Sequence, residues 1–189
     1  SKNPGKVGET IHNAGYKHLG LNFQYKAFSS NDIFGVIEGV KALGIRGCSI
    51  SMPFKEKVIP LLDELDPLAK QSRAVNTIVK NDNKLIGYNT DVFGIKKALD
   101  IKFKNDVIKK AVIFGAGGAA KAAVYVLLQR GLNNLTIVNR TKINAIKMID
   151  KFNDFNFDHS VFTFKEKFQA KSDCLSSDLI INTTILGMK

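Results

Sequence analysis

Hydrophobic positions alternate along the first part of the chain between a helical and an extended spacing. Apolar residues recur three and four positions apart from Ile33 to Leu43, which predicts an amphipathic helix that stops at Gly44. Residues 46–52 then alternate apolar with small polar side chains, so a strand is predicted in which Ser49 and Ser51 share the polar face. A helix followed by a half-buried strand is therefore the first predicted unit.

The same patterns continue to about residue 100 and then give way to a charged stretch. They predict a helix over residues 54–65, strands over 75–79 and 85–87 joined by a turn at 81–83, and a helix capped by residues 89–91. The charged stretch from Lys102 to Lys110 is the predicted linker. We therefore expect two domains, residues 1–100 and residues 101–189.

The second half of the chain has the pattern of a strand, a glycine turn, a helix and a strand. These segments are residues 111–114, residues 115–120, a helical pattern up to Gly131, and residues 135–138. This is the βαβ unit, which predicts a parallel sheet with helices on both faces. Residues 143–149 and 179–181 extend it by a further helix and strand. The predicted fold class is α/β, with two α/β domains.

The charge of the chain suggests an anionic partner. Among 189 residues, 28 are Lys or Arg and 17 are Asp or Glu, which gives a net charge of +11. Nucleic acid, an anionic membrane surface or a phosphorylated small molecule could all match this excess. Only four of the basic residues are Arg, and no run of five or six basic residues occurs. A lysine-rich solvated surface is therefore favoured over a nucleic-acid site.

The remaining composition is that of a chain that folds in water. No apolar run reaches the roughly 18 residues of a membrane-spanning helix, and the first residues have no signal-peptide pattern. Cys48 and Cys174 lie far apart and, with three scattered His, give no metal-ligand spacing. We therefore expect no membrane partner, no metal and a cytoplasmic location. The first residue is not Met and the sequence stops directly after an apolar stretch, so we also expect the chain to be truncated at both ends.

The glycine turn carries the pattern Gly115-x-Gly117-x-x-Ala120, the fingerprint of a Rossmann-type dinucleotide-binding domain. Gly115 allows the tight turn, Gly117 lets the backbone approach the pyrophosphate, and Ala120 lets helix and strand pack closely. Arg140 follows the next strand, where NAD-selective enzymes carry a carboxylate and where an arginine accommodates the 2′-phosphate of NADP. The sequence therefore favours NADP over NAD.

Five polar residues of the first half fall at predicted strand ends or in the turns after them: Ser49, Ser51, Lys55, Asn76 and Asp91. Open α/β sheets gather their ligands at such positions. Each residue also has a plain structural explanation, since Lys55 could be an exposed helix residue, Asn76 a turn former and Asp91 a helix cap. Position alone leaves both interpretations open.

Six short motifs, taken together and in order, resemble the shikimate dehydrogenase family. They are Ser49-Ile-Ser-Met-Pro-Phe-Lys55, Ala74-Val-Asn-Thr77, Asn89-Thr-Asp91, Gly115-Ala-Gly-Gly-Ala119, Asn139-Arg-Thr141 and Ile181-Asn-Thr-Thr, closing with Gly187-Met188. The resemblance extends from about residue 12 to the end of the chain. The form of the first motif and the long segment before His12 are closer to the shikimate dehydrogenase-like branch.

The resemblance implies an enzyme that reversibly reduces the ketone of 3-dehydroshikimate to shikimate with NADPH, in aromatic amino acid and chorismate biosynthesis. It implies that Lys55 and Asp91 are catalytic, and the residue types suit this, because a ketone that accepts hydride needs a cation and a proton. The substrate-binding residues that it implies are Ser1, Asn3, Ser51 and Asn76. The cofactor-binding residues that it implies are Gly115, Ala116, Gly117, Gly118, Ala119, Asn139, Arg140, Thr141 and Met188. A monomer or a homodimer is expected.

Three alternatives stay open. A quinate or related polyol acid dehydrogenase would use the same scaffold. A nucleotide-binding homologue with little turnover would account for Asn3, which stands where the family has the second serine of its carboxylate clamp, and for the family's closing segment that this sequence lacks. A nucleic-acid binder rests on charge alone.

Overall fold

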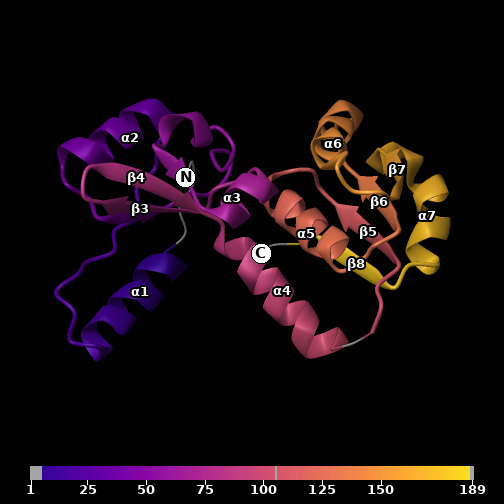
Figure 1. Ribbon diagram of the computed structural model, residues 1–189, viewed down its shortest axis with the longest axis horizontal. Helices are drawn as coiled ribbons and strands as arrows, with labels where there is room; N and C mark the ends of the chain where they lie inside the picture. The colour runs from indigo at the N-terminus through magenta and orange to yellow at the C-terminus, as the bar shows by residue number, and fades with distance from the viewer. Residues whose placement is uncertain (1–5, 105, 188–189) are drawn as a thin grey trace.

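The computed structural model describes residues 6–104 and 106–187. Its elements form two groups, each built around a four-stranded sheet and drawn on the left and on the right of Figure 1. The first group comprises α1 (Val7–His18), α2 (Ile33–Ala42), β1 (Gly47–Ser49), η1 (Ile59–Leu61), β2 (Glu64–Leu65), α3 (Pro67–Ser72), β3 (Thr77–Asn81) and β4 (Lys84–Tyr88). Helix α4 (Thr90–Phe103) leads from the first group to the second. The second group comprises β5 (Lys110–Phe114), α5 (Gly118–Gln129), β6 (Asn134–Val138), α6 (Lys142–Ile149), η2 (Asp150–Phe152), β7 (Asp158–Phe162), η3 (Phe164–Glu166), α7 (Lys167–Leu175) and β8 (Leu179–Asn182).

The first sheet is mixed and has the strand order β1-β3-β4-β2. The β1, β3 and β4 strands pair antiparallel, whereas β2 pairs parallel with β4. Helix α2 contributes Ile33, Ile37 and Val40 to the core that this sheet shares, and Asp32 caps the helix by accepting a hydrogen bond from the Gly35 N–H. The predicted helix over residues 33–43 and the predicted strands over residues 75–79 and 85–87 are therefore confirmed, as α2, β3 and β4.

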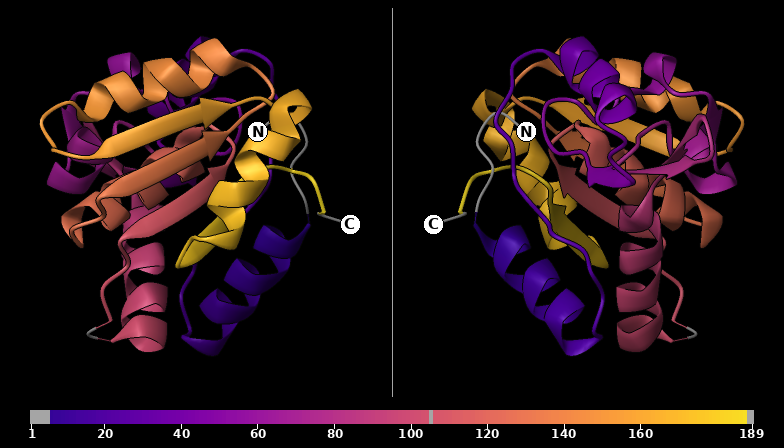
Figure 2. Two further views of the ribbon diagram at one scale, coloured as in Figure 1. Left: turned by 90° about the vertical axis from the view of Figure 1, so that its right-hand side faces the viewer. Right: turned by 90° about the vertical axis from the view of Figure 1, so that its left-hand side faces the viewer.

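The second sheet is parallel throughout and has the order β7-β6-β5-β8. Helices α5 and α6 pack on one face in a large apolar core, and α7 packs on the other face around Val112, Val138 and Ala170; both views in Figure 2 show helices flanking these strands. This confirms the predicted parallel sheet with two covered faces. The strand order reverses between β5 and β8, which is where such sheets leave a crevice for a ligand at their carboxyl ends.

The predicted helix over residues 54–65 is wrong. Turns follow Phe54, and only Ile59–Leu61 is helical, as the 3-10 helix η1, before the short strand β2. Two causes act together. Pro60 has no N–H to donate within a helix, and the Lys55 carbonyl already accepts the Val75 N–H at 2.8 Å, so Lys55 cannot offer that bond to a helix of its own.

Two further boundaries differ from the predictions. The strand expected over residues 46–52 is confined to β1, because only Gly47 to Ser49 pair with β3. The charged stretch expected as a linker is partly helical, since α4 extends to Phe103 and β5 begins at Lys110. Helices α1, α3 and α7 and strand β7 were not predicted. Within the described residues, no helix is long and apolar enough to cross a membrane.

Candidate active site

Lys55 and Asp91 form an ion pair at the start of α4. The Lys55 Nζ lies 2.6 Å from Asp91 Oδ2, and the two side chains are 17% and 27% exposed. The backbone of Lys55 is fixed by the bond from the Val75 N–H, so the lysine is anchored beside the beginning of β3. Two residues that lie far apart in the sequence are thus brought into contact at a site that stays partly exposed to solvent.

Asn76 holds the other carboxylate oxygen of this pair. Its Nδ2 donates to Asp91 Oδ1 and to Thr90 Oγ1, both at 2.8 Å. Its Oδ1 accepts from the Thr90 N–H and from the Thr77 hydroxyl. Both the nitrogen and the oxygen of the Asn76 side-chain amide are therefore hydrogen-bonded within the site, which fixes the orientation of the Asp91 carboxylate.

A buried polar layer, which sequence reasoning missed, lies behind Asp91. Asn89 caps α4 by accepting the Asp91 N–H at 3.0 Å, and its Nδ2 donates to Ser72 Oγ at 2.8 Å. The Ser72 hydroxyl donates in turn to the Leu68 carbonyl. Asn89 is 3% exposed and Ser72 is 0% exposed. Asn89 was identified only as a cap, and nothing in the sequence around Ser72 distinguishes it from a surface serine.

Ser51 lies on the approach to the pair. It is exposed, and its carbonyl accepts the Phe54 N–H in the turn that leads to Lys55. Its hydroxyl makes no hydrogen bond with the part of the chain that the structure describes. Ser1, Asn3 and Met188, which were also predicted to bind substrate or cofactor, lie outside the described residues.

The glycine turn between β5 and α5 lies at the reversal of the strand order. Gly115 has a φ of +108°, and a Cβ there would collide with the Thr183 hydroxyl after β8, so only glycine fits. A Cβ on Gly117 would meet nothing within 4 Å. The turn is thus tight on the side of β8 and open at Gly117, where the start of α5 presents backbone N–H groups that suit the pyrophosphate of a dinucleotide.

The glycine turn also touches the Lys55 side chain. A Cβ added to Gly118 would lie 2.9 Å from the Lys55 Cδ and 3.0 Å from its Cβ. The aliphatic stem of Lys55 therefore packs directly on the first turn of α5. The ion pair and the glycine turn, which come from the two groups of elements, meet at this contact.

Arg140 follows β6 at the same edge of the sheet as the glycine turn, because the Gly115 N–H donates to the Val138 carbonyl at 2.9 Å. Arg140 is exposed, and its guanidinium has no partner in the described ranges. Asn139 Nδ2 donates to the Thr141 carbonyl, which shapes this loop. Lys142, the other cation nearby, lies 3.4 Å from Glu166.

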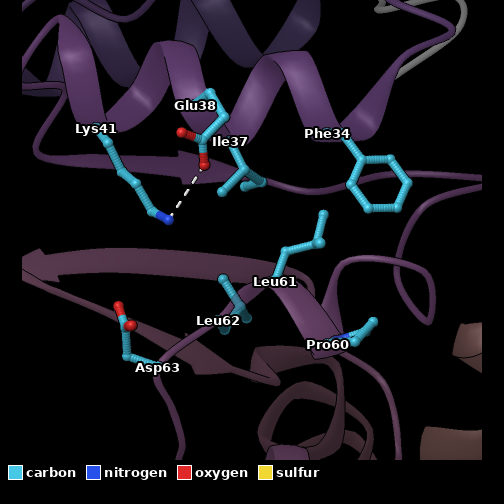
Figure 3. Close-up of a pocket in the computed structure, with 8 residues that line it drawn as sticks. All are labelled: Phe34, Ile37, Glu38, Lys41, Pro60, Leu61, Leu62 and Asp63. Carbon is cyan, nitrogen blue, oxygen red and sulfur yellow. Dashed lines mark hydrogen bonds and ion pairs between the residues drawn. The ribbon is translucent and has the colours of Figure 1, made fainter.

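Two hollows lie away from these residues. One of about 320 Å³ lies between α2 and η1 and is lined mainly by apolar side chains, with a Glu38–Lys41 ion pair at its rim (Figure 3). Another of about 650 Å³ lies between α3, α5 and η2. Neither is lined by a residue that was predicted to act in catalysis or binding. Among the described residues, no group of three His, Cys, Asp or Glu could hold a metal ion.

The second sheet is parallel and has a glycine turn where its strand order reverses, which defines a Rossmann-type protein. The first group of elements is an attached α/β domain, and it brings the Lys55–Asp91 pair to that turn. Two family models match the sequence in succession. They are the shikimate dehydrogenase substrate binding domain over residues 8–78 and shikimate / quinate 5-dehydrogenase over residues 97–186. The chain belongs to the shikimate dehydrogenase family, as its motifs predicted.

Known proteins resemble the chain along its whole length. It is 40% identical over 189 residues to a shikimate dehydrogenase-like protein of Haemophilus influenzae, with 100% of this chain and 65% of that protein covered. It is 38% identical over 180 residues to shikimate dehydrogenase (NADP(+)) of Moorella thermoacetica, with 94% and 61% covered. A crystal structure of shikimate 5-dehydrogenase from Listeria monocytogenes in complex with shikimate and NAD matches with a TM-score of 0.80 at 35% identity, covering 97% of this chain and 65% of that one. The chain thus spans less than two thirds of the length of these relatives.

Proposed function

We propose that the chain carries the substrate-binding and nucleotide-binding parts of an NADP-dependent oxidoreductase that interconverts 3-dehydroshikimate and shikimate, as a shikimate dehydrogenase or a shikimate dehydrogenase-like enzyme. In this proposal residues 1–100 form the substrate domain and residues 101–189 the nucleotide domain. The reaction belongs to aromatic amino acid biosynthesis. We expect a cytoplasmic enzyme that works as a monomer or a homodimer.

One observation carries the proposal: the Lys55–Asp91 pair is bound to the glycine turn through the Lys55 stem. The ammonium is 2.6 Å from the Asp91 carboxylate, and the stem packs on Gly118. A hydride-transfer enzyme needs its acid next to the carbonyl oxygen and the cofactor next to the carbonyl carbon, with both held at a fixed separation. A lysine of one domain packed on the nucleotide turn of the other meets that requirement.

The residue types suit reduction of a ketone. The Lys55 ammonium donates a hydrogen bond to the carbonyl oxygen, stabilises the negative charge that develops there and passes a proton to it. Asp91 keeps the ammonium oriented, and Asn76 keeps Asp91 oriented in turn. Ser51, together with Ser1 and Asn3, provides further hydrogen-bonding groups for substrate oxygens. Asn76 joins them by exchanging one of its present partners for a substrate hydroxyl.

The residues of the second sheet suit a dinucleotide with a 2′-phosphate. Bound NADPH supplies the hydride. Residues Gly115 to Ala119 would take the pyrophosphate, because the turn is open at Gly117 and carries the N-terminus of α5. Arg140, with Asn139 and Thr141 beside it, would take the 2′-phosphate, because its guanidinium is exposed and has no partner among the described residues. Met188 would border the same site.

A second candidate differs only in the substrate. The model that matches residues 97–186 describes shikimate and quinate dehydrogenases together. Quinate is also a six-membered ring with a carboxylate and several hydroxyls, but its ring is saturated and carries one more hydroxyl, so the oxidised hydroxyl can keep the proposed roles of Lys55 and Asp91. The choice depends on the groups that contact the ring, which is why both acids belong in the assay.

The test follows NADPH absorbance in the full-length protein with 3-dehydroshikimate, and NADPH formation with shikimate, with quinate and without an acid. Lys55→Met is expected to lower kcat by about 100-fold or more, the usual contribution of a positioned acid, while NADPH still binds. Lys57→Met changes an exposed lysine two positions away and is the matched control.

Full turnover in Lys55→Met would overturn the catalytic assignment. Failure of the wild-type protein to turn over either acid, with intact NADPH binding, would overturn the proposed function and identify a nucleotide-binding homologue. Turnover of quinate alone would select the second candidate.

A further inference from the structure

A group of three charged residues, the ion cluster, joins the segment after Lys55 to the second sheet. It consists of Glu56, Lys121 and Lys151. The Lys121 Nζ contacts Glu56 Oε2, and the Lys151 Nζ lies 3.4 Å from the same oxygen. Glu56 belongs to the first group of elements, whereas Lys121 lies in α5 and Lys151 in η2. The ion cluster therefore crosses from one proposed domain to the other.

Lys121 occupies an unfavourable position for a cation. Its side chain is 2% exposed, and burial lowers the pKa of its ammonium to about 8. It also lies in the first turn of α5, where the helix dipole disfavours positive charge. An apolar side chain of similar length would pack there without the cost of removing a charge from water. The fold alone gives no reason for a lysine at this position.

The position of the ion cluster gives a reason for the buried lysine at position 121. Lys55 and Glu56 are neighbours in the chain, and both contact the first turn of α5. The Lys55 stem packs on Gly118, and Glu56 bonds to Lys121 three residues further along the same turn. One packing contact could act as a pivot for the segment, but two contacts on successive residues fix its orientation.

We propose that the ion cluster positions Lys55 for catalysis, because it holds the segment that carries this lysine on the first turn of α5. This inference rests on the proposed function and deepens it. Glu56, Lys121 and Lys151 are positioning residues, and they touch neither substrate nor cofactor in this scheme. The cluster sets the separation between the Lys55 ammonium, which belongs to the substrate side, and the turn that receives the cofactor. Rates of transfer depend steeply on such a separation.

The test compares Lys121→Met with the wild-type full-length protein. Methionine keeps an unbranched side chain and removes the charge. We expect kcat to fall about tenfold or more, because Lys55 is no longer held at its working distance. We expect the KM for NADPH to stay within about twofold, because the glycine turn is unchanged. The melting temperature stays equal or rises, because a buried charge has been removed and Glu56 keeps Lys151.

A second readout separates positioning from general stability. With NADPH deuterated at the transferred position, the isotope effect on kcat is expected to grow in Lys121→Met, because a misplaced acid makes hydride transfer slower than product release. A purely structural role would lower the melting temperature and leave the isotope effect unchanged. Lys96→Met, which removes an exposed lysine from an ion pair on α4, is the control.

Glu56→Gln supplies the other arm of a double-mutant cycle. Alone it leaves Lys121 buried without its carboxylate, so both stability and kcat fall. Combined with Lys121→Met it regains the stability but not the kcat, and the two losses of kcat do not add. A wild-type kcat and isotope effect in Lys121→Met would overturn the positioning role alone. Absence of turnover in the wild-type protein would overturn the proposed function and this role with it.

Discussion

Replacing Gly118 by alanine tests how the glycine turn and Lys55 depend on each other. The new Cβ would lie 2.9 Å from the Lys55 Cδ and 3.0 Å from its Cβ, closer than the 3.4 Å at which ordinary contact begins. Gly118 is the first residue of α5 and is not among the residues with a positive φ. Alanine therefore suits the backbone and favours the helix by up to about 1 kcal/mol. The contact is relieved by moving the Lys55 stem.

The size of the effect follows from this distance. Relief of the contact requires a shift of about 0.5 Å, since the atoms must separate to an ordinary van der Waals distance. A misplacement of about 1 Å can reduce a rate about 100-fold. We therefore expect Gly118→Ala to lower kcat about tenfold, with a melting temperature that is unchanged or higher.

The assay measures kcat and the KM for NADPH at saturating 3-dehydroshikimate, together with thermal unfolding. Gly117→Ala is the matched comparison, because its Cβ would meet no protein atom within 4 Å and would enter the space proposed for the pyrophosphate. It should raise the KM for NADPH and keep kcat at saturating cofactor. Gly39→Ala in α2, which also has no neighbour within 4 Å, is the control. A wild-type kcat in Gly118→Ala would refute the reasoning that this turn holds Lys55.

Three further predictions concern stability and cofactor choice. Asn89→Ala removes the cap of α4 and leaves Ser72 without its donor, so the free energy of unfolding should fall by about 2 kcal/mol in denaturant titrations, whereas the exposed Asn83→Ala should change little. Arg140→Ser should shift the ratio of kcat/KM for NADPH over NADH about tenfold or more toward NADH, whereas the control Lys147→Ser should leave this ratio unchanged. An unchanged ratio in Arg140→Ser would contradict the proposed role of Arg140 in binding the 2′-phosphate. Lys121, which faces Glu56 and Lys151, has a pKa of about 8 when folded, below its ordinary 10.5. The unfolded chain therefore binds more protons between these values, and wild-type stability relative to Lys121→Met should rise from pH 8 to pH 10 by about 2 kcal/mol, with a flat difference contradicting the burial of this charge.

Local patterns predicted the second sheet because its information lies within short segments. Strands β5, β6 and β8 are short and mostly apolar, and Gly115 and Gly117 mark the turn between strand and helix, whereas β7, which begins with three polar residues, was missed. The first half was less predictable, since long-range bonds decide it. The Lys55 carbonyl is taken by Val75, which prevents the helix that the apolar spacing after Phe54 suggests. Helix α1 was not predicted, and none of its residues is buried.

In the candidate site, too, some residues could be predicted from the sequence and others could not. Sequence motifs identified Lys55, Asn76 and Asp91 by type, and the structure brings these three together through hydrogen bonds of 2.6 to 2.8 Å. No motif pointed to Ser72 or to Glu56 with Lys121, because their partners lie far away in the sequence and their residue types are common on surfaces. The residues that hold a site in place are found only when the fold has put them in contact.

Catalysis in the proposed enzyme depends on a relation between two units rather than on either motif alone. In the proposed scheme the glycine turn would bind a nucleotide without Lys55, and the Lys55–Asp91 pair has its own anchors in Val75, Asn76 and the cap of α4. What joins them is a packing contact at Gly118 and an ion cluster one residue further along the chain. Substitutions at that junction should therefore change kcat while they leave nucleotide affinity and the internal order of each unit intact, because the chemical step is the property that requires both units at once.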